Sequence, residues 1–258
     1  MANPEPVVKP VQYPSTAREL AALREAISPA RLTTYMRHAH GNARQALELY
    51  AWNMRAAAAL HPILHANEVA LRNAVNRALE SQFGAQWPYS QGFLRTLPAH
   101  ERATFEGNRR KLEKTRGVQR LSTGDVVAGQ TYYFWVSMLT SRFEQRVWQR
   151  EFARSFPFAP PHIGRAVMHA SAESIRLLRN RIAHHEPLLD YHLVGAYRRA
   201  LTMIRWISPE KAAWAVGRWP APETLHASFR GAAKRRAPQA RGTASIGRRA
   251  TGVRPLPA

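Results

Sequence analysis

The sequence predicts an all-α protein, and three observations support this prediction. Apolar residues recur at spacings of three and four along most of the chain, alternating apolar and polar runs are nearly absent, and helix-capping residues stand where the periodicity begins. At 258 residues the chain is long enough to bury a substantial core. It contains no cysteine, which excludes disulfides and cysteine-ligated zinc.

In the first third of the chain, helices are expected over residues 17–26, 28–40, 43–60 and 62–83. Ser28 followed by Pro29 is typical of a helix start, because serine caps the free N–H groups and proline suits the first helical position. Pro62 lacks a backbone N–H, so we expect it to begin a separate helix instead of continuing the one before it.

Further along, residues 84–98 form a loop, 99–115 a highly charged helix outside the core, and Ser122 begins another helix. The segment 132–156 is rich in aromatic residues, most of which we expect to be buried. Pro160-Pro161 then begins a long helix that reaches the stretch LLRNRIAHHEPLL at 177–189, and closing helices follow at 191–207 and 209–216.

Charge and composition divide the chain into three parts. Residues 1–16 form a flexible arm, 17–219 a helical domain, and 220–258 a disordered basic tail.

The net charge is +21, and only five of the 38 basic residues are lysine. Arginine binds phosphate through two parallel hydrogen bonds, so the composition favours a nucleic-acid partner. No signal peptide or bilayer-spanning segment is expected, and the chain should be cytoplasmic.

The stretch LLRNRIAHHEPLL contains an Arg-x-x-x-x-His pattern formed by Arg179 and His184. This pattern alone has little weight, because roughly 1.4 matches are expected by chance in a chain this rich in arginine. A second match joins Arg95 to His100, in the expected loop. Context must therefore separate the two matches.

The context of Arg179 is distinctive. On a helical wheel it lies about 40° from Ile175, on the apolar side, where a cation needs a partner. His184 lies about 140° from Arg179, so one straight helix cannot bring both to a single phosphate. Pro187 disfavours α geometry at Glu186, and we expect the helix to end near His184.

Several stretches in order resemble the Abi-like (abortive infection) family of the HEPN superfamily. They are SPARLTTYMRHAHGNARQALELYAWN (28–53), HANEVALRNAVNRAL (65–79), YYFWVSMLTSRFEQRVW (132–148), LLRNRIAHHEPL (177–188) and WISPEKAAW (206–214). The resemblance covers roughly residues 27–219 and implies a HEPN-type helical bundle. It also implies a homodimer in which two motif helices face each other, and metal-independent RNA cleavage in defence against phage.

The resemblance assigns catalytic roles to Arg179, Asn180 and His184. An imidazole titrates near neutral pH and suits proton transfer, whereas a guanidinium suits stabilisation of the phosphorane. His185 is either a second catalytic imidazole or a cap on the helix end. Arg176 and Arg181 are expected to bind RNA.

Glu68 and Arg72 are further candidates, one turn apart on an earlier helix. They are either an exposed ion pair or, as the resemblance implies, support for the site, with Glu68 pairing with Arg179. Asn73 is a weaker candidate of the same kind. His61 and His65 have metal-ligand spacing but no evident third ligand, so neither a metal nor another cofactor is expected.

Three functions remain open at this point. The first is a ribonuclease that acts on RNA as a homodimer, with a regulatory RNA or an antitoxin as a further partner. The second is a non-catalytic RNA-binding protein of the same fold, in which Arg179 and His184 only bind phosphate. The third is a nucleic-acid-packaging protein whose function lies in the basic tail.

Overall fold

A computed structural model describes residues 16–117 and 121–219, and in these ranges the chain forms helices and no strand. The all-α prediction is therefore confirmed. The expected arm and basic tail fall on residues 1–15 and 220–258, outside the described residues, whereas Thr16 caps the first helix. The α-helices are α1 (Ala17–Ile27), α2 (Pro29–His38), α3 (Ala43–Phe83), α4 (Gln91–Leu94), α5 (Ala99–Arg116), α6 (Thr123–Ala128), α7 (Tyr132–Ser137), α8 (Gln149–Ser155), α9 (Arg165–Ala183), α10 (Leu193–Ile207) and α11 (Pro209–Arg218).

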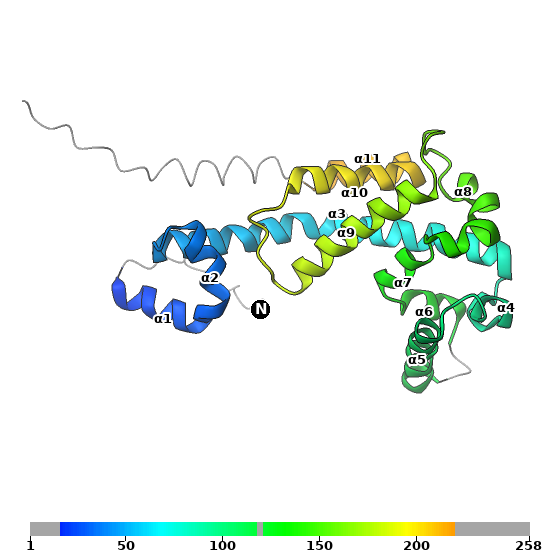
Figure 1. Ribbon diagram of the computed structural model, residues 1–258, viewed down its shortest axis with the longest axis horizontal. Helices are drawn as coiled ribbons and strands as arrows, with labels where there is room; N and C mark the ends of the chain where they lie inside the picture. Colours follow the sequence, from blue (N-terminus) through cyan, green and yellow to red (C-terminus); the bar gives the residue numbers. More distant parts are fainter. Residues whose placement is uncertain (1–15, 118–120, 220–258) are drawn as a thin grey trace, which may run out of the picture.

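Helix α3 is the axis of the molecule, and the other helices lie along it (Figure 1). Its 41 residues correct the expectation of two helices, because Pro62 lies inside α3 without ending it. A proline in a helix interior costs about 3 kcal/mol. Leu60, Ile63 and Leu64 beside it are fully buried, and burial of such side chains contributes about 1.5–3 kcal/mol each. Packing therefore outweighs the local penalty.

Two apolar cores are built on α3. The small core joins α2 to the start of α3 through Leu32, Tyr35, Ala46 and their neighbours, and the large core contains the rest of α3 with the helices from α4 to α11. Leu189, in the loop between α9 and α10, packs against both cores. Through Leu189, the loop that follows the candidate motif thus contacts both apolar cores.

The aromatic segment 132–156 is largely buried as expected, but it is not one helix. It comprises α7, a 3₁₀ turn (Ser141–Phe143), a π-helical turn (Glu144–Trp148) and α8, with Trp135, Phe143, Trp148 and Phe156 buried. The expected loop 84–98 likewise contains a 3₁₀ turn (Trp87–Tyr89) and α4. The expectation that the charged helix α5 lies outside the core is wrong in one respect, because its Phe105 is buried in the large core against Phe93 and Phe134.

The motif helix begins later than expected. The prediction that Pro160-Pro161 starts it is wrong, because Gly164 is the N-terminal boundary residue and the helix runs from Arg165 to Ala183. It packs against α3, α7 and α10. Met168, Ala172, Ile175 and Leu178 form its buried face. Arg179 is thereby placed at the edge of the core, as the wheel indicated.

Candidate active site at the end of α9

Helix α9 ends in a Schellman motif, a turn in which two backbone hydrogen bonds close the last helical turn. His184 is the capping residue, and His185 follows with a φ of 56°. The backbone N–H of His185 donates to the carbonyl of Ile182 at 3.0 Å, and that of Glu186 to the carbonyl of Arg181 at 2.9 Å. This pattern defines the motif, and glycine usually occupies the position of His185. Both histidine side chains are exposed.

The turn is held by side chains from distant helices. Asn53 of α3, which is only 5% exposed, donates to the carbonyl of Glu186 at 3.3 Å and accepts from the N–H of Leu188 at 2.6 Å. Arg31 of α2 donates to the carbonyl of His185 at 2.7 Å. These contacts fix the backbone on which His184 and His185 stand.

Arg181 braces the same turn from within α9. Its guanidinium donates to the carbonyl of Pro187 at 3.0 Å, pairs with Glu186 at 3.3 Å and lies over the ring of Tyr191 at 5.0 Å. The sequence assigned Arg181 to RNA binding. Within one chain its donors contact the loop, and its role in RNA binding stays a prediction.

Arg179 forms an ion pair with Glu68 of α3, with 3.4 Å between Nε and Oε2. This contact is the one that the resemblance implied. The Arg179 side chain is 40% exposed and that of Glu68 is 22% exposed, so the pair lies at the boundary between core and solvent. Glu68 neutralises the cation on one side and leaves much of the guanidinium surface open to a ligand.

A buried polar network lies directly behind this ion pair. The hydroxyl of Tyr132 donates to Asn67 Oδ1 at 2.8 Å, and the Asn67 amide donates to the carbonyl of Ala200 at 3.0 Å. Burial raises the pKa of Tyr132 far above its usual range, with a smaller contribution from Glu68. Tyr132 therefore stays protonated and joins α7 to α3, while Asn67 joins α3 to α10.

The remaining polar residues of the motif differ in the number of side-chain hydrogen bonds and ion pairs that they make. Arg176 donates to Glu173 at 2.6 and 2.7 Å and lies 5.5 Å from the ring centroid of Tyr133, so it too is held by its own chain. The side chains of Asn180 and His184 make no hydrogen bond or ion pair to the rest of the described chain. The same holds for the imidazole of His185, a residue that takes part only through its backbone groups.

The structure separates Arg72 from Arg179. Arg72 Nε donates to Asn73 at 3.3 Å, and Arg72 lines a pocket with residues of α6. No ion pair joins Arg72 to Glu68 among the described residues. Within one chain the contacts of Arg72 are with Asn73 and the pocket beside α6, so its support of the motif stays a prediction.

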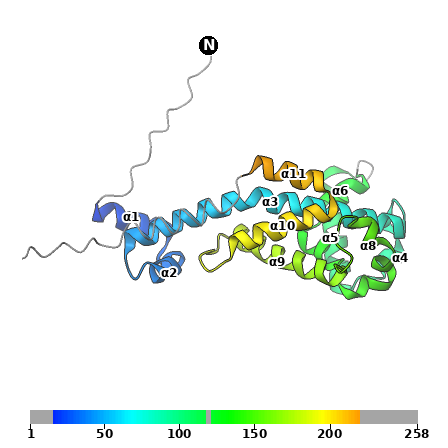
Figure 2. The same cartoon turned by 90° about the horizontal axis from the view of Figure 1, so that it is seen from above.

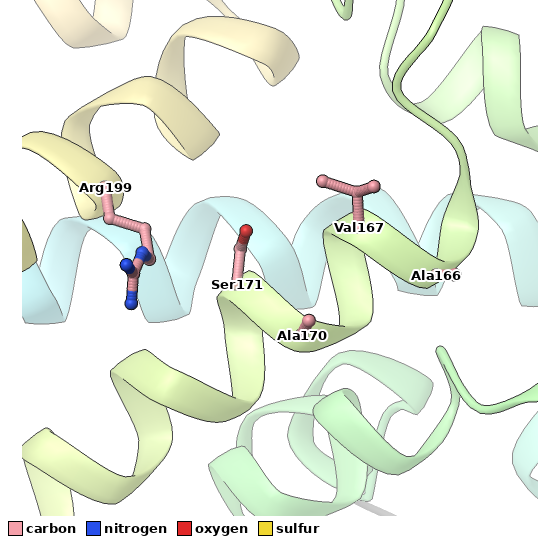
Figure 3. Close-up of a pocket in the computed structure, with 5 residues that line it drawn as sticks. All are labelled: Ala166, Val167, Ala170, Ser171 and Arg199. Atoms are coloured by element: carbon pink, nitrogen blue, oxygen red, sulfur yellow. The ribbon is translucent and has the colours of Figure 1, made fainter.

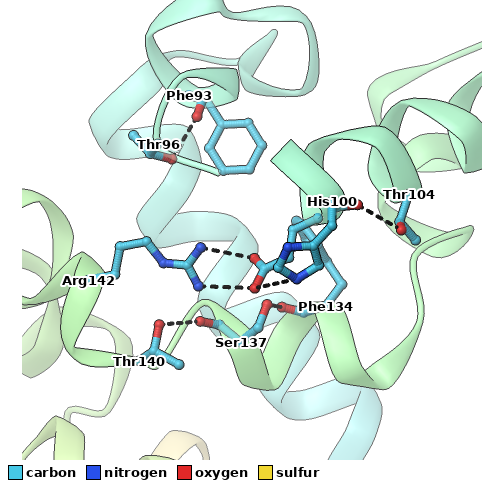
Figure 4. Close-up of polar contacts among 9 residues, drawn as sticks. Phe93, Thr96, His100, Thr104, Phe134, Ser137, Thr140 and Arg142 are labelled. Atoms are coloured by element: carbon cyan, nitrogen blue, oxygen red, sulfur yellow. Dashed lines mark hydrogen bonds and ion pairs between the residues drawn. The ribbon is translucent and has the colours of Figure 1, made fainter. Parts of the chain in front are cut away.

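In the second Arg-x-x-x-x-His match, His100 lies beside an ion pair made by Arg142 (Figure 4). Arg95 caps α4, whereas His100 stands in the first turn of α5. His100 lies 3.9 Å from Glu101, whose carboxylate accepts two hydrogen bonds of 3.1 Å from Arg142. This cluster joins α5 to the turn that follows α7, and its carboxylate is already neutralised.

On another flank of α9 the surface is open and made of small side chains. A pocket of about 490 Å³ is lined by Ala166, Val167, Ala170 and Ser171 of α9 and by Arg199 of α10 (Figure 3). Val167 is 42% exposed, and Leu177 further along the helix is 53% exposed. This flank allows another helix to approach α9 closely.

Neither a metal nor a membrane is indicated by the described residues. In the ranges 16–117 and 121–219, no three His, Asp or Glu side chains are grouped so that they could hold a metal ion. His61 and His65 are both exposed on α3. None of the described helices combines the length and the apolar character that a bilayer crossing needs.

Sequence reasoning missed Asn53 and Arg31. Each lies more than 130 positions from the backbone groups that it binds, so neither has a local signal. The available hint is the position of Asn53 beside Trp52 on the apolar side of its helix. A buried amide there needs a partner.

Comparisons with protein-family models, curated proteins and solved structures gave no match to this chain.

Proposed function

We propose that the protein is a metal-independent endoribonuclease whose active site is built around Arg179, Asn180 and His184. The observation on which the proposal depends is the braced turn at the end of α9. It holds an exposed, unpartnered imidazole at His184, five residues after a guanidinium that pairs with Glu68. Catalytic side chains work best on a backbone that is fixed in this way.

The reaction uses the 2′-hydroxyl of RNA as its nucleophile. A histidine removes the 2′-proton while the 2′-oxygen attacks phosphorus, the bond from phosphorus to the 5′-oxygen breaks, and an acid protonates that oxygen. The products are a 2′,3′-cyclic phosphate and a 5′-hydroxyl. Arg179 suits the doubly charged phosphorane, because its fork donates to two phosphate oxygens at once.

Arg179 and His184 lie about 140° apart on the wheel of α9, so one chain does not easily bring both to the same phosphate, and we infer a site shared by two chains. The resemblance to Abi-like HEPN proteins implies that two copies of α9 face each other. The flank of small side chains near Ala170 and Ser171 suits such an approach. Two copies of His184 then divide the acid and base roles.

The test is RNA cleavage by the wild type and by His184→Ala with a chelator present. Loss of a general acid or base is expected to slow cleavage by about 10²- to 10⁴-fold. The matched control is His65→Ala, which removes an equally exposed imidazole from α3 and should leave the rate unchanged. Cyclic phosphate ends on the wild-type products identify the 2′-hydroxyl route, and single-stranded DNA should stay intact.

A non-catalytic RNA-binding protein is the second candidate. It is favoured by the separation of the two groups within the described part of one chain, where Arg179 pairs with Glu68 and makes no hydrogen bond or ion pair with His184. Under this alternative the wild type binds RNA and releases no cyclic phosphate. If His184→Ala cleaves as fast as the wild type, the proposed catalytic role is wrong.

A further inference from the structure

Arg72 of α3 and Lys211 of α11 lie on a side of α3 that the candidate active site does not use. Arg72 of α3 lies close enough to Lys211 of α11 for its charge to act on the ammonium group. Burial lowers the pKa of Lys211, and the charge of Arg72 lowers it further. Neither side chain forms an ion pair with a carboxylate in the described chain. Two like charges without a counter-charge favour the binding of an anion.

Polar groups surround Arg72, which is the member of this pair that lines the neighbouring pocket. Arg72 lines an open pocket of about 530 Å³ between α3 and α6, together with Asn73, Asn76, Gln86 and Thr123. Glu80 is the one acidic residue among those that line it. Amide and hydroxyl groups of this kind bind phosphate and sugar oxygens.

An exposed aromatic side chain continues the same surface along α11. Trp214 is 53% exposed, and it lies three residues after Lys211 and four before Arg218, so the three side chains share one flank of the helix. A base can stack on an exposed indole while neighbouring cations hold the phosphates. In Figure 2, α11 and α9 lie on different sides of α3.

We propose that Arg72, Lys211 and Trp214, beside the pocket between α3 and α6, bind single-stranded RNA at a surface separate from the candidate active site. The cations contact successive phosphates, and Trp214 stacks on a base. Phosphate contacts supply affinity, and stacking selects a strand whose bases are free. This proposal does not depend on cleavage, since a strand can bind here whether or not His184 is catalytic.

The test measures binding of the full chain to a fluorescent single-stranded 2′-O-methyl RNA, which has no free 2′-hydroxyl and so cannot be cut. The variant Arg72→Gln/Lys211→Gln removes two phosphate contacts. The slope of log affinity against log salt concentration should then become shallower by about 1.4, since each contact contributes about 0.7 on a single strand. The control Arg24→Gln/Arg150→Gln removes two exposed charges elsewhere and should keep the wild-type slope.

Stacking is tested separately. Trp214→Ala should weaken binding at least about fivefold, whereas Trp214→Phe keeps an aromatic face and most of the affinity. Inorganic phosphate added at constant ionic strength should not displace the strand. The proposal is overturned if the double variant keeps the wild-type salt slope, if Trp214→Ala binds like the wild type, or if phosphate alone displaces the RNA.

The outcomes here and those of the cleavage test are independent. If His184→Ala cleaves normally while Arg72→Gln/Lys211→Gln loses affinity, the catalytic assignment fails and the binding surface stands. If His184→Ala loses cleavage while the double variant binds as the wild type does, the catalytic assignment stands and the proposed binding surface is wrong.

Discussion

The ends of α2 and α9 share one backbone turn and differ in what the turn presents. Both are Schellman motifs with histidine in the left-handed position, His40 with a φ of 48° and His185 with a φ of 56°. In α2 the capping residue is Ala39, which is buried, and the chain passes directly into α3. In α9 the capping residue is His184, which is exposed. The turn at the end of α2 connects two helices, whereas the turn at the end of α9 presents an exposed imidazole.

The buried polar groups at the two turns differ as well. At the α9 turn the amide of Asn53 has partners for both its oxygen and its nitrogen. In α2 the hydroxyl of Tyr35 is fully buried and has no hydrogen-bond partner in the described chain. Arg31 connects the two regions, because it donates to the carbonyl of His185 and its charge acts on Tyr35. Of these two buried polar side chains, the one at the turn that carries the candidate site is therefore the one with hydrogen-bond partners.

The largest expected effect is at Asn53. Asn53→Ala should lower the free energy of unfolding by about 2–3 kcal/mol, because it leaves a buried N–H and a buried carbonyl without their partner. Urea denaturation measures this loss. Hydrogen exchange should also become faster over residues 184–191, and cleavage should fall with it.

Asn67→Ala is the matched control for this prediction. It also removes a buried asparagine with two hydrogen bonds, but those bonds hold Tyr132 and Ala200. A similar loss of stability is expected, with normal exchange over residues 184–191. Equal exchange in the two variants would show that Asn53 has no special role at the turn.

Local signals in the sequence were enough for much of the fold. Ser28 and Ser122 cap helices as predicted, because the capping hydroxyl acts within three residues. Pro62 misled the prediction, since the burial that keeps α3 continuous involves helices far away in the chain. The periodicity of apolar residues does not indicate that α9 begins at Arg165 and not at Pro161.

The candidate site was predictable in part for the same reason. The position of Arg179 on the wheel showed that it needs a partner, and the resemblance pointed to Glu68. Arg72 lies only one turn beyond Glu68, yet within one chain its contacts are with Asn73 and the pocket beside α6. The bracing by Asn53 rests on contacts between residues more than 130 positions apart.

The next prediction compares the two left-handed histidines. His185→Gly and His40→Gly should each raise the free energy of unfolding by about 1 kcal/mol, because glycine adopts this conformation without the steric cost of a Cβ. Thermal or urea denaturation measures the gain. The comparison becomes sharper in the cleavage assay, where a catalytic role for the His185 imidazole predicts loss of activity in His185→Gly alone. A loss of stability in either variant would contradict the assigned turn.

The smallest expected effect at neutral pH is that of Tyr35→Phe. Removing a buried hydroxyl that has no partner should raise the free energy of unfolding by about 0.5 kcal/mol. Burial, with a smaller contribution from Tyr50, raises the pKa of Tyr35 from 10 to about 12. In the unfolded chain this hydroxyl ionises first, so the stability that the protonated tyrosine contributes is complete below pH 10 and is lost as the pH rises through 12.

The phenylalanine variant cannot ionise, so its advantage over the wild type should widen between pH 10 and 12 in urea denaturation. Tyr132 contributes an alkaline loss of the same sign to both proteins, and the difference between them isolates Tyr35. A constant difference across this range would mean that Tyr35 ionises equally in the folded and unfolded chain. In that case its hydroxyl would reach water or a partner, and the contrast with the fully bonded Asn53 would disappear.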